Sequence, residues 1–223
     1  MGDLLRYLSE HRGQVLELLG EHLVLVAIAV VIAVAIGVPL GILSTRDRRV
    51  ERVALGTANV LQTVPSLALF GFLIPVPVLG GIGASTAIVA LTLYALLPIV
   101  RNTHAGIRGV DPALAEAGRG MGMTDRQLLA KVELPLAAGV IVAGVRVATV
   151  ISIGIATIAA AIGAGGLGVY IFQGLAMVDD TVILAGAVPA ALLALAADGA
   201  LGWLARRLTP PGAPGAPGSV RPA

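Results

Sequence analysis

The sequence contains no cysteine and few charged or aromatic side chains. Among its 223 residues, 13% are charged and 3% are aromatic, whereas 57% are hydrophobic. The absence of cysteine excludes disulfide scaffolds, zinc ribbons and thiol catalysis. Soluble domains carry about 25% charged residues, so half of that value leaves too little polar surface for a water-facing fold. Together with a mean hydropathy of +0.95, this composition indicates an integral membrane protein.

Long hydrophobic runs predict an all-α membrane protein. A membrane-spanning helix needs roughly 20 mostly apolar residues. Five stretches meet that length and are predicted to be transmembrane helices, at about 23–43, 53–74, 82–100, 136–162 and 182–204. They define a transmembrane domain over residues 21–207. Residues 1–20 mix apolar and charged side chains, which predicts an interfacial amphipathic helix. Residues 208–223 are rich in Pro and Gly and are predicted to be disordered.

The basic residues predict how the chain is oriented in the membrane. Twelve of the fifteen lie in the first connection, the third connection and the C-terminal end. The second and fourth connections, 75–81 and 163–181, carry none. Lys and Arg are retained on the cytoplasmic side, so the N-terminus is predicted to lie outside and the C-terminus inside the cell. We therefore expect a multi-pass protein of the cell membrane.

Residues 101–135 form the one long polar insertion between two predicted spans. Asp111, followed by a proline, predicts the start of a short helix that ends at Gly120. Thr124, with a glutamine three residues later, predicts a capping box and a second short helix that ends at Pro135. Two such helices are suited to docking a partner protein. A loop that only caps the bundle is an equally acceptable interpretation of this pattern.

The same loop carries the residues of a known motif. Its spacing resembles the EAA-x3-G-x9-I-x-L-P loop of type I ABC importer permeases. The matching residues are Glu116, Ala117, Gly118, Gly122, Val132, Leu134 and Pro135. Gly118 replaces the third Ala of the motif, and Val132 replaces its Ile. The segments 61–69, 94–103 and 162–168 are similar to the osmoprotectant branch, which imports glycine betaine, carnitine or choline.

The resemblance implies the five-helix fold of type I ABC importer permeases, with the loop 101–135 as the coupling element. It implies transport by alternating access, together with a second permease copy or paralogue. Two cytoplasmic ATP-binding subunits and an extracytoplasmic substrate-binding protein complete such an importer. The sequence has no G-x-x-x-x-G-K-[ST] motif, so ATP and Mg are expected on the partner ATPases and no cofactor on this chain. The alternatives are a permease for methionine or another small solute, and a passive channel, which would not need a docking loop.

Polar side chains mark one face of the predicted second span. They recur at positions i, i+3, i+4 and i+7, as Asn59, Gln62, Thr63 and Ser66. A polar face in a membrane helix turns towards protein or water, so it either forms interhelical hydrogen bonds or lines a pathway. Pro65 lies beside this face and predicts a kink in the helix.

Two charged residues, Arg146 and Asp198, lie inside predicted spans. At 1.5 Å per residue, both are roughly 12–16 Å from the cytoplasmic side of the membrane. A buried charge needs a partner, so the similar depths predict a structural ion pair. The alternative is that the long Arg146 side chain extends to the cytoplasmic surface.

The sequence predicts no catalytic, metal or nucleic-acid site. Its three histidines are dispersed and have no set of carboxylates at metal-ligand spacing. No nucleophile motif is present, and a net charge of +2 is too small and too scattered for a nucleic-acid surface. The few aromatic residues are too far apart to form a cage for a quaternary ammonium ion. Substrate recognition is therefore expected in the separate binding protein.

Overall fold

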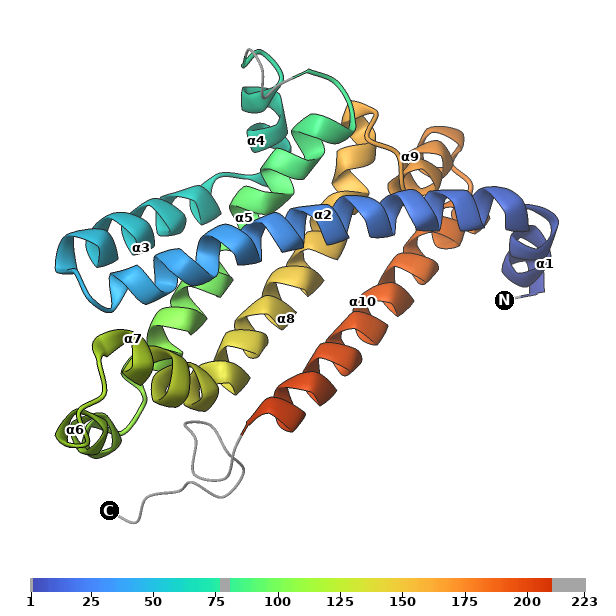
Figure 1. Ribbon diagram of the computed structural model, residues 1–223. Helices are drawn as coiled ribbons and strands as arrows, with labels where there is room; N and C mark the ends of the chain where they lie inside the picture. The colour runs from blue at the N-terminus through green and yellow to red at the C-terminus, as the bar shows by residue number, and fades with distance from the viewer. Residues whose placement is uncertain (1, 77–80, 210–223) are drawn as a thin grey trace, which may run out of the picture.

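The computed structural model describes residues 2–76 and 81–209, and their regular secondary structure is helical throughout (Figure 1). In chain order the helices are α1 (Gly2–Glu10), α2 (Arg12–Ser44), α3 (Arg48–Thr63), α4 (Ser66–Leu73), α5 (Ala84–Arg108), α6 (Pro112–Gly120), α7 (Asp125–Leu128), α8 (Leu134–Ala159), α9 (Gly168–Met177) and α10 (Asp180–Leu208). Within the described ranges, four helical segments are long and apolar enough to cross a membrane: α2, α5, the segment from α7 through α8, and α10. The bent pair α3 and α4 counts as a fifth span when the two are taken together.

The second span is not the single helix that the sequence predicts over 53–74. Helix α3 begins earlier, at Arg48, and α3 and α4 meet at an angle of 104°. Val64 between them has φ −73° and ψ 126°, because a following proline disfavours the helical conformation. The Tyr94 hydroxyl donates a hydrogen bond to the Val64 carbonyl, which has no partner within α3. The kink predicted at Pro65 is therefore a sharp break between two helices.

The second helix of the loop does not end at Pro135 as predicted. A π-helical segment, Leu129–Glu133, joins α7 to α8, so one helical segment continues through the proline. Pro135 is the second residue of α8. A proline cannot donate a hydrogen bond and its ring clashes with the carbonyl four residues earlier. The π-helical segment relieves this conflict through wider hydrogen bonds, such as that from the Leu134 N–H to the Leu129 carbonyl.

Three segments have other helix boundaries in the structure than the sequence predicts. Helix α1 covers only part of the amphipathic segment predicted over 1–20, and residues 12–20 form the first turns of α2. The connection 163–181 contains the short helix α9, which the sequence analysis did not identify. Helix α10 continues to Leu208, and the predicted disordered tail lies outside the described residues from position 210.

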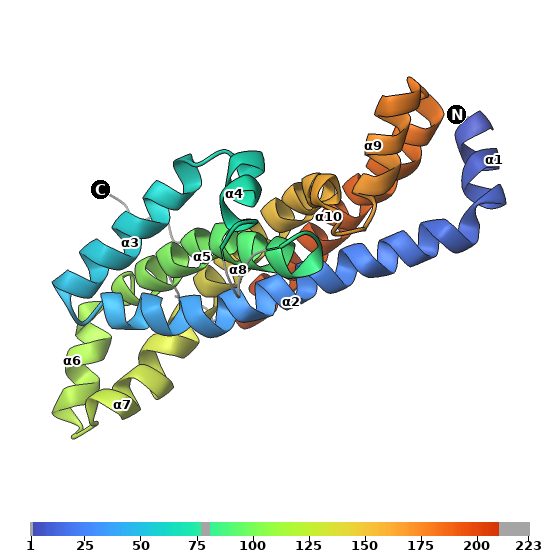
Figure 2. The ribbon, with the colours of Figure 1, turned by 90° about the horizontal axis from the view of Figure 1, so that it is seen from above.

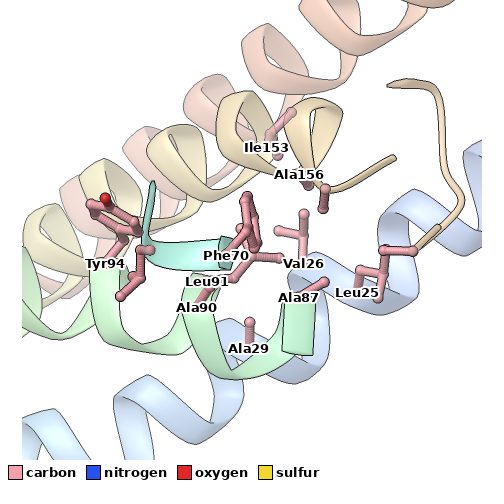
Figure 3. Packing of buried hydrophobic residues seen from close by; sticks show 13 residues of the cluster. Leu25, Val26, Ala29, Phe70, Ala87, Ala90, Leu91, Tyr94, Ile153 and Ala156 are labelled. Atoms are coloured by element: carbon pink, nitrogen blue, oxygen red, sulfur yellow. The ribbon is translucent and has the colours of Figure 1, made fainter. Parts of the chain in front are cut away.

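The main hydrophobic core forms where α2, α4, α5 and α8 meet. Figure 3 shows Phe70 of α4 and Leu91 of α5 between α2 and α8, and both side chains are fully buried. Ala29, Ala87 and Ala156 surround them with no exposed area. Small residues at these positions allow the helix backbones to approach closely, which is how helices associate within a membrane.

The two ends of the bundle carry different elements. In both views, the turn between α2 and α3 lies near α6 and α7 at one end, whereas α1 and α9 lie at the other (Figures 1 and 2). The loop 101–135 therefore shares its end of the molecule with four basic residues, Arg46 in that turn and Arg48, Arg49 and Arg52 in the first turns of α3.

Candidate functional site

The loop 101–135 begins with a firmly capped helix, α6. The Asp111 carboxylate accepts a hydrogen bond of 2.9 Å from the Ala113 N–H, and Pro112 occupies the first turn. These contacts confirm the predicted start of the helix, which ends at Gly120 as expected. Glu116 and Ala117 are exposed on the outer side of α6. The helix is thus fixed at its start, while Glu116 and Ala117 of the motif face away from the bundle.

The inner side of α6 packs against α7 through Gly118. A Cβ atom at this position would lie 2.8 Å from Cδ1 of Leu128, whose side chain is fully buried. The small residue at the third position of the motif therefore permits the contact between the two helices. The predicted capping box holds α7 in place, because Thr124 Oγ1 accepts from the Gln127 N–H and Gln127 Oε1 accepts from the Thr124 N–H at 2.9 Å.

Gly122 makes the turn between α6 and α7 possible. Its φ is +81°, a left-handed conformation that glycine adopts without strain. A Cβ atom at this position would meet nothing within 4 Å, so packing within the chain does not demand a glycine here. Met121, the preceding residue, is 73% exposed, and Leu114 in the first turn of α6 is 48% exposed. Together with Glu116, they give the loop an outer surface of exposed apolar groups and one carboxylate.

The base of the loop holds a contact that sequence analysis missed. Val132 and Leu134 are half-buried and Pro135 is exposed, whereas Glu133 between them is buried. The Glu133 carboxylate accepts a hydrogen bond from Nη2 of Arg46, which lies in the turn between α2 and α3. The one signal in the sequence is an acidic residue flanked by two apolar ones. Nothing in the sequence identifies its partner 87 positions away.

The predicted polar face of the second span is divided by the break at Pro65. Asn59, Gln62 and Thr63 are exposed on α3, whereas Ser66 begins α4 beyond the bend. The prediction that all four share one helix face is therefore wrong. Three polar side chains remain on an exposed face of α3, within two turns of its C-terminal end.

The structure brings the two charged residues inside the spans together. Arg146 of α8 donates to Asp198 of α10 through both Nε and Nη2, each at 2.5 Å from a carboxylate oxygen. The planar guanidinium is suited to this bidentate hydrogen bonding to a carboxylate. Their side chains are 39% and 40% exposed in the single chain. The pair joins α8 to α10 and leaves part of its polar surface at the outside of the bundle.

One groove within the described residues offers little to a charged solute. A groove of 470 Å³ lies between α2, α3 and α5, and its walls are mostly apolar, with Leu40, Val53, Leu61 and Leu96 among them. No aromatic side chain lines it. Among the residues that the structure places, no three His, Asp or Glu side chains gather where they could hold a metal ion. The groove therefore lacks the aromatic surfaces that hold quaternary ammonium groups.

Comparison with known proteins identifies the family to which this chain belongs. The family described as "Binding-protein-dependent transport system inner membrane component" matches residues 37–210. The chain belongs to this family. It is a membrane-spanning permease of an ABC importer and carries no ATPase domain.

Named relatives resemble this permease along almost its whole length. It is 48% identical over 210 residues to the carnitine transport permease protein OpuCB of Listeria monocytogenes, covering 94% of this chain and 95% of that protein. It is 46% identical to the choline transport system permease protein OpuBB of Bacillus subtilis, covering 95% and 96%. It is 47% identical to the osmoprotectant import permease protein OsmW of Salmonella typhimurium, covering 92% and 95%.

A solved structure matches the observed fold. The permease superposes with a TM-score of 0.82 on a chain of the inward-facing MetNI methionine ABC transporter, at 26% identity. The match covers 90% of this permease and 99% of that chain. The predicted fold class is therefore confirmed, with the broken α3–α4 pair in place of one regular span.

Proposed function

We propose that this permease is the membrane-spanning subunit of an ATP-driven importer of quaternary ammonium osmoprotectants such as glycine betaine, carnitine or choline. The names of relatives that are 44–48% identical along nearly the full chain support this substrate class. The resemblance to the methionine transporter chain is weaker, at 26% identity, and supports a shared fold. A methionine permease is therefore the less favoured alternative.

The observation that carries the proposed mechanism is the construction of the loop 101–135. Helix α6 exposes Glu116 and Ala117, while Gly118 fixes its inner side on α7. Helix α7 continues through the π-helical segment into α8. A force applied to α6 is therefore passed to a membrane span. A passive channel would have no use for this connection, whereas a permease driven by an ATPase needs one.

The proposed assembly has two permeases, identical or paralogous, two ATP-binding subunits docked on α6 and an extracytoplasmic binding protein. In this arrangement the loop 101–135 lies in the cytoplasm, and α1 and α9 lie at the outer end. The distribution of basic residues supports this orientation. ATP and Mg would bind to the ATPase subunits.

The exposed polar face of α3 fits a place at the centre of such an assembly. The amide groups of Asn59 and Gln62 would contact lipid if α3 lay on the outside, and unpaired polar groups in hydrocarbon are costly, whereas the Thr63 hydroxyl donates to the Val60 carbonyl at 2.8 Å. Facing the second permease or the substrate pathway removes that cost. We therefore assign this face to the interior of the assembled transporter.

A competition assay tests the substrate class. The permease, its ATPase subunits and its binding protein are reconstituted in vesicles, and uptake of radiolabelled glycine betaine is followed. We expect unlabelled choline or carnitine in roughly 100-fold excess over its dissociation constant to suppress uptake by more than about 90%. Methionine at the same concentration should have no effect. Suppression by methionine, without suppression by choline or carnitine, would replace the proposed substrate class.

A further inference from the structure

Glu133 stands out because it is a buried carboxylate at the base of the coupling loop. The residue is 6% exposed, and no other Asp or Glu within the described ranges is buried. Its partner Arg46 belongs to the turn that joins α2 to α3. The Arg46 side chain is 40% exposed, so the burial falls on the carboxylate, whose removal from water costs several kcal/mol, and an apolar side chain at position 133 would pack as well or better. Packing alone therefore gives no reason for an ion pair at this position.

The turn that carries Arg46 is also tied to α5. Ser44 Oγ, at the end of α2, lies 2.8 Å from Nδ1 of His104 on α5, and Ser44 also donates to the Gly41 carbonyl at 2.7 Å. On the other side of the same imidazole, Nε2 lies 3.5 Å from a carboxylate oxygen of Glu51 on α3. The end of α2 and the start of α3 thus form one polar cluster with His104, and the Arg46–Glu133 pair joins this cluster to the loop.

The segment that carries Glu133 is suited to changing shape. Leu129–Glu133 is π-helical, and such segments are short, rare in proteins and often found at functional sites. It lies between α7, which holds the docking helix α6, and α8, which spans the membrane. A shift of α6 is passed to α8 through this segment, as well as through α5, to which residues 109–111 join α6. It therefore moves Glu133, and the ion pair moves the start of α3 with it.

We infer that Arg46 and Glu133 are positioning residues that transmit movement of the coupling loop to α3. The inference rests on the proposed function, because it requires an ATPase that moves α6. Movement of α6 then reaches the spans by two routes. One is the continuous helix from α7 to α8, and the other is the ion pair to α3. This route ends on the helix that carries Asn59, Gln62 and Thr63, so it reaches the polar face assigned to the interior of the transporter.

Distance measurements on the complete complex test the inference. The chain has no cysteine, so pairs of cysteines can be introduced and spin-labelled without first replacing native cysteines. One pair, Arg119→Cys with Leu195→Cys, reports on α6 relative to α10. A second pair, Val60→Cys with Leu195→Cys, reports on α3 relative to α10, and all three positions are exposed. Each distance is measured without nucleotide and after trapping with ATP and vanadate.

In the wild-type background we expect both distances to change on trapping. With Glu133→Gln, which keeps the shape but removes the charge, we expect the α6 distance to change normally and the α3 distance to stay fixed. The ATP hydrolysed per solute imported should rise roughly fivefold or more, the range expected when a coupling free energy is lost. Arg46→Gln should act in the same way, and Arg46→Lys should restore part of the coupling. Arg48→Gln, which removes a neighbouring exposed charge, should change neither readout.

The outcomes separate this inference from the proposed function. A normal α3 response in both Glu133→Gln and Arg46→Gln would overturn the inference and leave the importer intact. Failure of both variants to assemble, with Arg46→Lys no better than Arg46→Gln, would also overturn it, because the pair would then be purely structural. A wild-type complex that responds to ATP at neither position would overturn the proposed function itself, and the inference with it.

Discussion

Replacing Gly122 with aspartate is expected to abolish solute uptake while the chain still inserts into the membrane. Gly122 is exposed at the turn between α6 and α7, so the substitution leaves the packing of the spans unchanged. It adds a side chain and a negative charge to the surface that we propose as the docking site of the ATPase. Loss of about 1.4 kcal/mol of binding free energy weakens association tenfold, and we expect at least that loss. Uptake and solute-stimulated ATP hydrolysis in reconstituted vesicles measure the effect.

The alanine variant separates backbone strain from interference at the docking surface. Gly122→Ala forces an L-residue into a φ of +81°, which costs on the order of 1–2 kcal/mol within the loop. It adds only a methyl group to the outer surface and should therefore retain measurable uptake. If Gly122→Asp retained both uptake and stimulated hydrolysis at the wild-type level, the loop would be a simple cap of the bundle.

Replacing Gly144 with leucine is expected to prevent the bundle from folding. Gly144 of α8 packs directly against α5, and a Cβ atom there would lie 2.5 Å from Cβ of Asn102 and 2.8 Å from the Pro98 carbonyl oxygen. The helices must separate to admit even a methyl group, and overpacking of this kind costs on the order of 3 kcal/mol. We expect little monodisperse protein in detergent, and a lower melting temperature for any that is recovered.

Gly154, on the same helix, provides the matched control. A Cβ atom at this position would meet nothing within 4 Å, and the residue is exposed. Gly154→Leu should therefore not destabilise the bundle, and the higher helix propensity of leucine is expected to add about 0.5–1 kcal/mol of stability. Equal melting temperatures for the two leucine variants would show that the close contact between α5 and α8 does not determine the stability of the bundle.

Local signals in the sequence predicted the coupling loop well. The caps at Asp111 and Thr124 depend on hydrogen bonds to residues two or three positions away, and the structure contains both. Arg146 and Asp198 were predicted to meet because the constant rise of a helix fixes their depth in the membrane, and they are in contact.

Features that depend on distant residues were missed. The bend at Pro65 reaches 104° where Tyr94, some 30 positions away, provides a hydrogen bond to the freed carbonyl at the break. The continuation through Pro135 depends on a π-helical segment that no residue type specifies by itself. Glu133 carries no signal that names Arg46 as its partner. At Val64 and at Glu133 the deciding contact joins segments that only the folded bundle brings together.

Accumulation of solute against its concentration gradient tests the central claim most directly. Vesicles containing the permease and its ATPase subunits enclose ATP and Mg, and the binding protein and labelled glycine betaine are supplied outside. We predict that the inner concentration rises well above the outer one, and that this rise disappears when ATP is omitted or replaced by an analogue that cannot be hydrolysed. Entry that needs no ATP and stops at equal concentrations on both sides would contradict the account and identify a passive channel.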